Sequence, residues 1–389
     1  MGNQRETDQE TLFYDRLKKF RRRLVAATII SLIAIFLCFN FTGNIFFLLT
    51  GQTENLIGDG EELQKGKKFP EGEIVEEKIP EEKINPGLRP FAAKFPPTVT
   101  NYETLMASRG MPPMFPPAVS TETVTVTEKH IPGPEGAPDV HIRIFSPVEK
   151  EKLVGGLLWI HGGGYMYELM EMEDSRCLRF AQEANCVVVS VDYRVAPENP
   201  YPAPLDDCYA ALEWFSKNAE MLGVDDTRIA IGGGSAGAGL AAGVCLWARD
   251  NEGPKIAFQM PLCPMIDDRH ITPSSTEVTD RRFWNLEANI FGWASYLGDI
   301  PYDEVPIYAA PARAKDLSGL PPAYFFVGEL DLFRDEAINF ANRLIEAGVT
   351  TEFHIFPGCF HGFEILADGE ISRIANDETV RALKIALEQ

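Results

Sequence analysis

The chain has 389 residues, of which 36 are Lys or Arg and 57 are Asp or Glu, so its formal net charge is −21. Such an acidic surface repels phosphate backbones, which argues against a nucleic-acid-binding protein. Hydrophobic residues make up 45% of the chain and charged residues 24%, a composition that excludes a disordered or collagen-like protein and is typical of a globular one.

The amino-terminal segment combines a basic cluster with a long uncharged stretch. Residues 1–23 carry seven Lys or Arg against four Asp or Glu, and no charged residue occurs from Leu24 to Thr53. A helix needs about 20 apolar residues to cross a bilayer, so residues 24–49 are predicted to be an uncleaved transmembrane anchor. Because the Lys and Arg excess precedes the span, we expect a cytoplasmic arm at 1–23 and an extracytoplasmic main domain. Secretion after signal cleavage is the alternative.

The composition then changes twice more along the chain. Residues 50–89 are dense in Glu and Lys and interrupted by prolines, so a solvated stalk is expected there. The main domain is expected at 90–389. Within it, residues 90–120 are rich in Phe, Met and Pro, and residues 268–310 are rich in aromatic side chains and proline. Both segments are predicted to form a cap over the strand ends, where α/β sheets bind ligands.

From about residue 120 onward, strand-like and helix-like runs alternate. The predicted strands are 121–127, 140–145, 157–160, 187–191, 228–231, 257–262, 324–327 and 351–356. The predicted helices are 174–185, 205–222, 236–250 and 335–347. Several strand runs are continuously apolar, as strands buried on both faces are. The alternation predicts an α/β fold whose mainly parallel sheet is covered by helices on both faces.

The sharpest motif is GGSAG at 233–237, directly after one predicted strand and directly before a predicted helix. Glycines around Ser235 permit the strained turn that exposes a nucleophilic hydroxyl at a helix N-terminus. A rival pattern, GxGxxG, begins at Gly232 and is typical of dinucleotide binding. It requires an acidic residue at the end of the next strand, whereas Asp250 ends a helical pattern. A nicotinamide-dependent oxidoreductase is therefore the weaker alternative.

A second glycine motif, HGGGY at 161–165, follows another apolar strand. An α/β-hydrolase needs backbone N–H groups at this place to bind an oxyanion. Glycine allows the main chain to approach a substrate carbonyl closely, since any Cβ would intrude. The two motifs together favour a hydrolase.

A serine hydrolase of this type also needs a histidine and a carboxylate, in the chain order serine, acid, histidine. Three histidines follow Ser235, and His361 is the one in a glycine-bounded loop after the last predicted strand. His354 lies within a strand, where a strand-face role is the better interpretation. His270 falls in the expected cap.

Three carboxylates compete for the role of the acid. Asp331 lies just past a predicted strand and is preferred for its chain order and loop position. Asp335 fits better as the first carboxylate of the next helix, and Glu329 is the remaining competitor.

On these motifs, the chain from about residue 90 resembles the hormone-sensitive-lipase-like family of α/β-hydrolases, which includes many microbial carboxylesterases. The matching segments are HGGGY, VDYRVAPE followed by PYPA, GGSAG, DLFRD and HGF. The resemblance implies an α/β-hydrolase fold with a helical cap and a triad of Ser235, Asp331 and His361. It also implies an oxyanion hole formed by the N–H groups of Gly163, Gly164 and Ala236. One departure is Gly234, where the family usually has Asp before the nucleophile.

The expected function is hydrolysis of short- to medium-chain acyl esters through a covalent acyl-enzyme. The expected partners are a small-molecule ester and, through the amino-terminal helix, a membrane, and neither a cofactor nor a metal is expected. The seven cysteines are scattered without a CxxC pair, so a zinc site or a disulfide framework is not expected. The acidic domain favours neutral esters over strongly anionic ones. A ligand-binding receptor built on a hydrolase scaffold is the other alternative, and the oligomeric state is left open.

Overall fold

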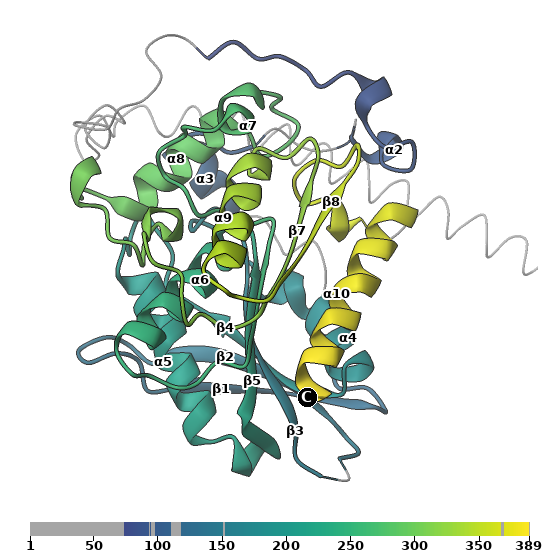
Figure 1. Cartoon of the computed structure of the whole chain (residues 1–389), viewed down its shortest axis with the longest axis vertical. Coiled ribbons are helices and arrows are strands. Elements are labelled where there is room, and N and C mark those ends of the chain that lie inside the picture. Colours follow the sequence, from purple (N-terminus) through teal and green to yellow (C-terminus); the bar gives the residue numbers. More distant parts are fainter. Residues whose placement is uncertain are drawn as a thin grey trace, which may run out of the picture. The chain divides into compact units, whose positions relative to one another are not determined.

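An eight-stranded sheet carries the site and the helices around it (Figure 1). The computed structural model describes residues 74–92, 94, 98–109, 118–150, 152–366 and 369–388. The strands are β1 (Val124–Ile131), β2 (Val140–Pro147), β3 (Val154–Ile160), β4 (Cys186–Asp192), β5 (Val224–Gly234), β6 (Phe258–Leu262), β7 (Ala323–Gly328) and β8 (Thr351–Phe356). Their order in the sheet is β1-β2-β4-β3-β5-β6-β7-β8. Strand β2 pairs antiparallel with β1 and β4, and all other pairs are parallel.

Within the described chain, two short α-helices precede β1, and the others connect the strands or follow the last one. The α-helices of the described residues are α2 (Arg89–Ala92), α3 (Tyr102–Arg109), α4 (Asp174–Glu183), α5 (Ala203–Lys217), α6 (Ala236–Asp250), α7 (Pro273–Glu277), α8 (Leu286–Leu297), α9 (Arg334–Glu346) and α10 (Glu370–Glu388). Short 3₁₀ turns are η1 (Glu81–Lys83), η2 (Met170–Glu173), η3 (Glu220–Leu222), η4 (Tyr302–Glu304), η5 (Pro311–Arg313) and η6 (Phe363–Ile365).

The central strands of the sheet are buried on both faces, which explains why most of their side chains are apolar. In β3, Leu158 and Ile160 pack into the cluster formed with α5, α6 and α9, whereas Leu157 and Trp159 pack into the cluster formed with α4 and α10. Successive side chains of a strand point to opposite faces, so most positions of a strand covered on both sides are apolar. The predicted α/β fold with a mainly parallel, doubly covered sheet is confirmed.

Two long helices were not predicted as such. Helix α8 lies in the aromatic segment expected to belong to the cap, and α10 follows the loop that contains His361. Helix α10 packs on the sheet through a stripe that includes Ala375, Leu383 and Leu387. Strand β1 also continues to Ile131, beyond the predicted end at residue 127, because it pairs with β2 along its whole length.

Residues 74–92, which we call the amino-terminal strap, pack on the domain. Residues 74–89 of the strap belong to the segment 50–89, for which a solvated stalk was expected. Ile84 and Leu88 are fully buried. The Asn85 N–H donates a hydrogen bond of 2.8 Å to the Gly358 carbonyl, in the loop between β8 and His361. Two apolar anchors and this hydrogen bond place the strap on the described domain.

The expected localisation as a single-pass membrane protein is contradicted. Among the described residues, no helix combines the length and the apolar character that crossing a bilayer requires. The longest described helix is α10. It is not apolar enough because it carries charged side chains along its length, among them Arg373, Asp377 and Lys384. The expected anchor at 24–49 and the arm at 1–23 lie outside the described residues.

A buried ion pair joins β2 and α4, and its contribution to the stability of the fold can be measured. Arg143 and Asp174 are each 3% exposed and are joined by a hydrogen bond. Replacing Arg143 with Met leaves the Asp174 carboxylate buried without its cation, and we expect the free energy of unfolding to fall by about 3–5 kcal/mol. Denaturant unfolding measures this loss.

The exposed pair of Lys217 and Glu213 is the matched control. Lys217→Met should change the free energy of unfolding by less than about 1 kcal/mol. The double variant Arg143→Met, Asp174→Leu should recover most of the loss, because it removes both charges. A single variant as stable as the parent would contradict the expectation.

Candidate active site

Ser235 occupies the sharp turn between β5 and α6. It ends the strand and caps the helix with φ 55° and ψ −118°, a backbone conformation that non-glycine residues rarely adopt. Gly237 makes the turn possible, because a Cβ there would lie 2.1 Å from the Ile160 carbonyl oxygen. The turn places the Ser235 hydroxyl at the N-terminus of α6, where the helix dipole favours negative charge.

The structure brings the three residues expected to form the triad together. His361 Nε2 lies 3.0 Å from Ser235 Oγ, and His361 Nδ1 lies 2.8 Å from Asp331 Oδ2. Because a carboxylate only accepts, Nδ1 carries the proton and donates it to Asp331, which leaves Nε2 free to accept from the serine hydroxyl. The second oxygen of Asp331 accepts the Phe333 N–H at 2.9 Å, so both carboxylate oxygens are fixed.

The electrostatic surroundings of His361 are set by opposing effects. Burial by itself lowers the pKa of the imidazole. The charge of Asp331, its hydrogen bond and the charge of Glu364 outweigh burial, so the pKa of His361 is raised above its ordinary value. The raised pKa means that these negative charges stabilise the protonated imidazolium form of His361.

The HGGGY segment packs against the turn that carries Ser235. Gly163 and Gly164 have φ values of 108° and 58°, and no group among the described residues accepts a hydrogen bond from their N–H groups or from that of Ala236. A Cβ at Gly164 would lie 2.3 Å from the Trp284 ring, which explains the glycine. Three unused donors beside Ser235 are what binding of an oxyanion requires.

His161 holds this segment in place and takes no part in proton transfer. Burial lowers the pKa of His161 to about 4, so the imidazole is neutral. Its Nδ1 donates to the Gly162 carbonyl at 2.8 Å, and its ring stacks on Tyr193 at 4.2 Å. The Tyr193 hydroxyl in turn donates to the His161 carbonyl at 3.0 Å.

The competing carboxylates are engaged elsewhere. Glu329 accepts the Gly358 N–H at 2.8 Å. Asp335 accepts the Ser274 N–H at 2.8 Å and pairs with Arg334 at the start of α9.

The other two late histidines also lie away from Ser235. His354 pairs with Glu352 on β8, and His270 is close to Asn289. Asp250, examined for the dinucleotide pattern, ends α6 and pairs with Arg249.

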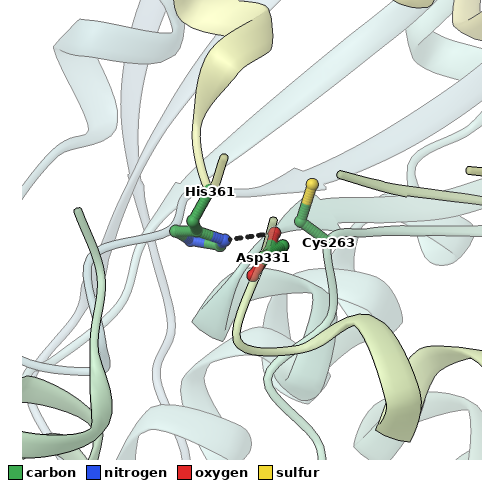
Figure 2. Close-up of side chains that lie close together, drawn as sticks. All are labelled: Cys263, Asp331 and His361. Atoms are coloured by element: carbon green, nitrogen blue, oxygen red, sulfur yellow. Dashed lines mark hydrogen bonds and ion pairs between the residues drawn. The ribbon is translucent and has the colours of Figure 1, made fainter. Parts of the chain in front are cut away.

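Sequence reasoning missed several neighbours of His361, among them Cys263, Trp284 and Glu364. Figure 2 shows the Cys263 side chain, which directly follows β6, beside Asp331 and His361. The Trp284 ring centre lies 6.4 Å from that of His361, and Glu364 contributes to the charge around it. The nearness of Glu364 in the sequence was an available signal, whereas Cys263 and Trp284 reach the site only through the tertiary fold.

Two groups of described residues bring metal-ligating atoms together. Cys263, Asp331 and His361 form the first, in which the imidazole and the carboxylate already share a hydrogen bond of 2.8 Å, too short for an ion between them. Glu352, His354 and Glu378 form the second, in which Arg381 pairs with both glutamates. Neither arrangement favours a metal.

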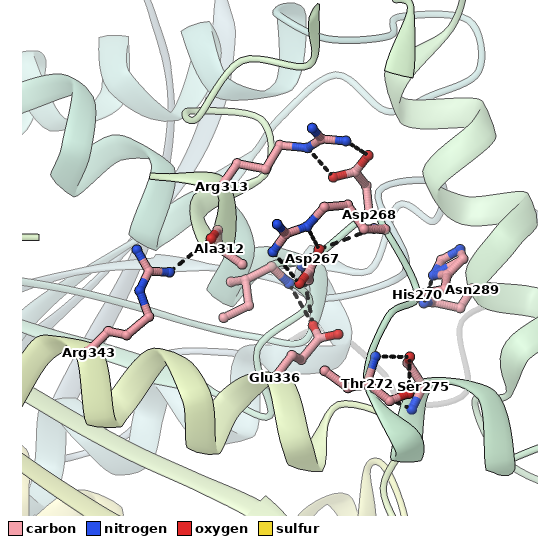
Figure 3. A network of polar contacts seen from close by, with 12 residues as sticks. Asp267, Asp268, His270, Thr272, Ser275, Asn289, Ala312, Arg313, Glu336 and Arg343 are labelled. Carbon is pink, nitrogen blue, oxygen red and sulfur yellow. Dashed lines mark hydrogen bonds and ion pairs between the residues drawn. The ribbon is translucent and has the colours of Figure 1, made fainter. Parts of the chain in front are cut away.

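A polar network fixes the loop that leads from β6 toward α7 and α8 (Figure 3). Glu336 of α9 is buried and accepts the Ile266 N–H at 3.0 Å. Burial, together with the charge of Asp267, raises the pKa of Glu336 well above its ordinary value. Arg313 holds Asp268 with two hydrogen bonds of 2.7 and 2.8 Å. The network does not include Ser235, and it holds the loop between β6 and α7 against α9.

A serine on a strained turn at the end of a parallel strand, next to a histidine and a glycine-rich loop, is typical of the α/β-hydrolase class. Comparison with known families agrees, since residues 157–365 match the family described as alpha/beta hydrolase fold. The chain belongs to this family, and its resemblance to the hormone-sensitive-lipase-like branch is confirmed.

Individual relatives extend the match beyond the family segment. Carboxylesterase NlhH of Mycobacterium tuberculosis is 34% identical over 289 residues, which cover 72% of this chain and 88% of that protein. Arylesterase of Saccharolobus solfataricus is 34% identical over 229 residues, covering 58% and 73%. Among solved structures, a bacterial heroin esterase aligns with a TM-score of 0.73 and 39% identity, covering 79% of this chain and 98% of its own.

Proposed function

We propose that the protein is a carboxylic-ester hydrolase in which Ser235 is the nucleophile, His361 the general base and Asp331 the acid that orients it. The observation that carries the proposal is the unbroken pair of contacts, 3.0 Å from Ser235 to His361 and 2.8 Å from His361 to Asp331. The esterase relatives support the substrate class.

The geometry supports acyl transfer in two stages. The Ser235 Oγ attacks the ester carbonyl while its proton passes to His361 Nε2, and the carbonyl electrons move onto the oxygen. The N–H groups of Gly163, Gly164 and Ala236 would bind that oxyanion. Collapse breaks the bond to the alcohol, which takes the proton from His361. Water then repeats the sequence on the acyl-enzyme and releases the acid and the free serine.

A fluorophosphonate probe tests this proposal. An activated serine attacks the phosphorus and displaces fluoride, so the intact protein should be labelled at Ser235, as located by peptide mass spectrometry. A ligand-binding receptor or an oxidoreductase on this fold would leave Ser235 unlabelled, and that result would overturn the proposal.

The segments 90–120 and 268–310 are proposed to form the cap, with residues 93, 95–97 and 110–117 outside the described part of the chain. The support is a small apolar cluster of Val99, Leu105 and Met166, against which Trp284 and Phe291 pack. Arg109 of α3 fastens it, since its Nε donates to the Met166 carbonyl at 2.9 Å.

The cap is proposed to restrict the acyl chain to short or medium length. A Cβ at Gly164 would lie 2.3 Å from the Trp284 ring, so this ring closely covers the glycine loop. In a series of p-nitrophenyl esters, kcat/KM should peak between acetate and octanoate and fall toward palmitate. Trp284→Ala should move the peak to longer chains, with Trp247→Ala, which alters a ring beside Tyr308, as the control. A parent enzyme fastest on palmitate would contradict the expectation.

A further inference from the structure

Glu364 is a buried carboxylate in the turn that directly follows His361. It lies in η6, its side chain is 7% exposed, and its Oε1 accepts a hydrogen bond of 3.4 Å from Arg176. Its other oxygen, Oε2, is buried and has no hydrogen-bond partner among the described residues. Burying a carboxylate with only one oxygen satisfied costs free energy, so stability gives no reason for it.

Arg176, the partner of Glu364, is fixed by rigid parts of the fold. It lies in the first turn of α4, its Nε is 3.4 Å from Glu173, and its guanidinium lies over the Trp159 ring of β3 at 5.4 Å. It also borders the nucleophile turn, since a Cβ at Gly234 would meet only its Nη1, at 3.6 Å. Arg176 therefore lies between the serine turn and the histidine loop.

The rest of the turn after His361 is tied to α10. The Phe363 carbonyl accepts the Ser372 hydroxyl at 2.7 Å, and the Glu364 carbonyl accepts the Asn376 amide at 2.8 Å. Side chains of α10 thus hold the main chain of this turn, while the Glu364 side chain forms an ion pair with Arg176 of α4. The loop that carries His361 is fastened from two helices.

We propose that Glu364 is a positioning residue for His361: held by Arg176, its carboxylate fixes the loop of the base and adds its negative charge to the field at the imidazole. This inference rests on the proposed function, because it concerns the same base.

Besides the rings of Trp284 and Phe333, four polar or titratable groups of the described residues face His361. Asp331 follows β7, Cys263 follows β6, Ser235 begins α6 and Glu364 lies in η6. Asp331 is the main source of negative charge, and Glu364 adds to it, so both raise the pKa of His361 against the effect of burial. Burial and the nearby charges of Glu364 and Asp331 raise the pKa of Cys263 well above its ordinary value, so this thiol is neutral and adds no charge. Removing the charge of Glu364 therefore lowers the pKa of His361.

The experiment compares Glu364→Gln with Glu173→Gln, in the full chain and with an aryl ester. Both substitutions remove one negative charge beside Arg176, but only Glu364 follows the histidine and contributes to its field. For Glu364→Gln we expect kcat to fall about 10-fold with KM nearly unchanged, because the base is less well positioned. The acid limb of the kcat/KM profile should move to lower pH. Glu173→Gln should leave kcat and the acid limb as in the parent.

A purely structural role for Glu364 predicts a different pattern. The two variants would then lose thermal stability together and share the parent pH profile, and that result would overturn the inference. Glu364→Asp keeps the charge but shortens the reach to Arg176. It should keep the acid limb near that of the parent while lowering kcat, so the inference stays testable if the Gln variant folds poorly. If the acid limb of the kcat/KM profile also moved to lower pH in Glu364→Asp, the negative charge of Glu364 would not be what sets the pKa of His361.

Fluorophosphonate labelling separates this inference from the proposed function. If the parent is labelled at Ser235 and the Glu364→Gln profile coincides with it, the inference alone fails. If the parent is not labelled, the proposed function fails and the inference with it.

Discussion

Ser235→Ala should lower kcat for an aryl ester by about 10⁴- to 10⁶-fold, because no other hydroxyl can form the acyl-enzyme. The side chain contributes little to packing, since the turn is set by backbone contacts around Gly237. The variant should therefore keep the circular dichroism and melting temperature of the parent while losing fluorophosphonate labelling. Residual hydrolysis would come from the glycine loop and substrate binding alone.

Ser295→Ala is the matched control for this substitution. Ser295 is buried in α8, and its hydroxyl has no partner within the described part of the chain. Its removal should leave both turnover and labelling unchanged. Undiminished turnover by Ser235→Ala would remove Ser235 from the mechanism.

Asp331→Asn should lower kcat by about 10³- to 10⁴-fold with KM nearly unchanged. An amide in this place can donate to His361 Nδ1, which favours the tautomer whose Nε2 carries the proton and cannot accept from Ser235. The loss of the Asp331 charge also lowers the pKa of His361, because that charge is the main effect opposing burial. The acid limb of kcat/KM should accordingly move to lower pH, which a rate profile measures.

Asp335→Asn tests whether the neighbouring carboxylate was assigned correctly. Asp335 accepts the Ser274 N–H and pairs with Arg334, and neither contact reaches His361. We expect a modest loss of thermal stability with near-normal kcat. If Asp335→Asn lost activity and Asp331→Asn kept it, the acid would be Asp335.

The parts of the fold that local patterns predict are those whose packing leaves a signature in the sequence. The continuously apolar run that became β3 indicated burial on both faces, because Leu157 and Leu158 each need an apolar environment on opposite sides. Helix α10 was not predicted although Ala375, Leu383 and Leu387 are buried, because charged residues interrupt the apolar ones along its length. The burial of Ile84 and Leu88 in the strap was not predictable for a similar reason, since both are isolated apolar residues in a segment rich in charge and proline.

The candidate site was predictable where chemistry and chain order coincide. Ser235 and the HGGGY segment each follow a strand, so parallel pairing brings their ends to one edge of the sheet. Cys263 and Trp284 were not predictable, because their distance to His361 depends on how β6 and the loop before α8 are placed. The ion pair between Arg176 and Glu364 is likewise a long-range contact, formed across most of the domain sequence.

The amino-terminal strap has a practical consequence for anyone who shortens this protein. Composition suggests cutting at residue 90, but that cut would strip Ile84 and Leu88 from the apolar surface beneath them and leave the Gly358 carbonyl without Asn85. The damage would fall on the loop that leads to His361, so a trimmed enzyme could express well and still be slow. A shortened chain should therefore keep the whole strap, from Ile74 onward.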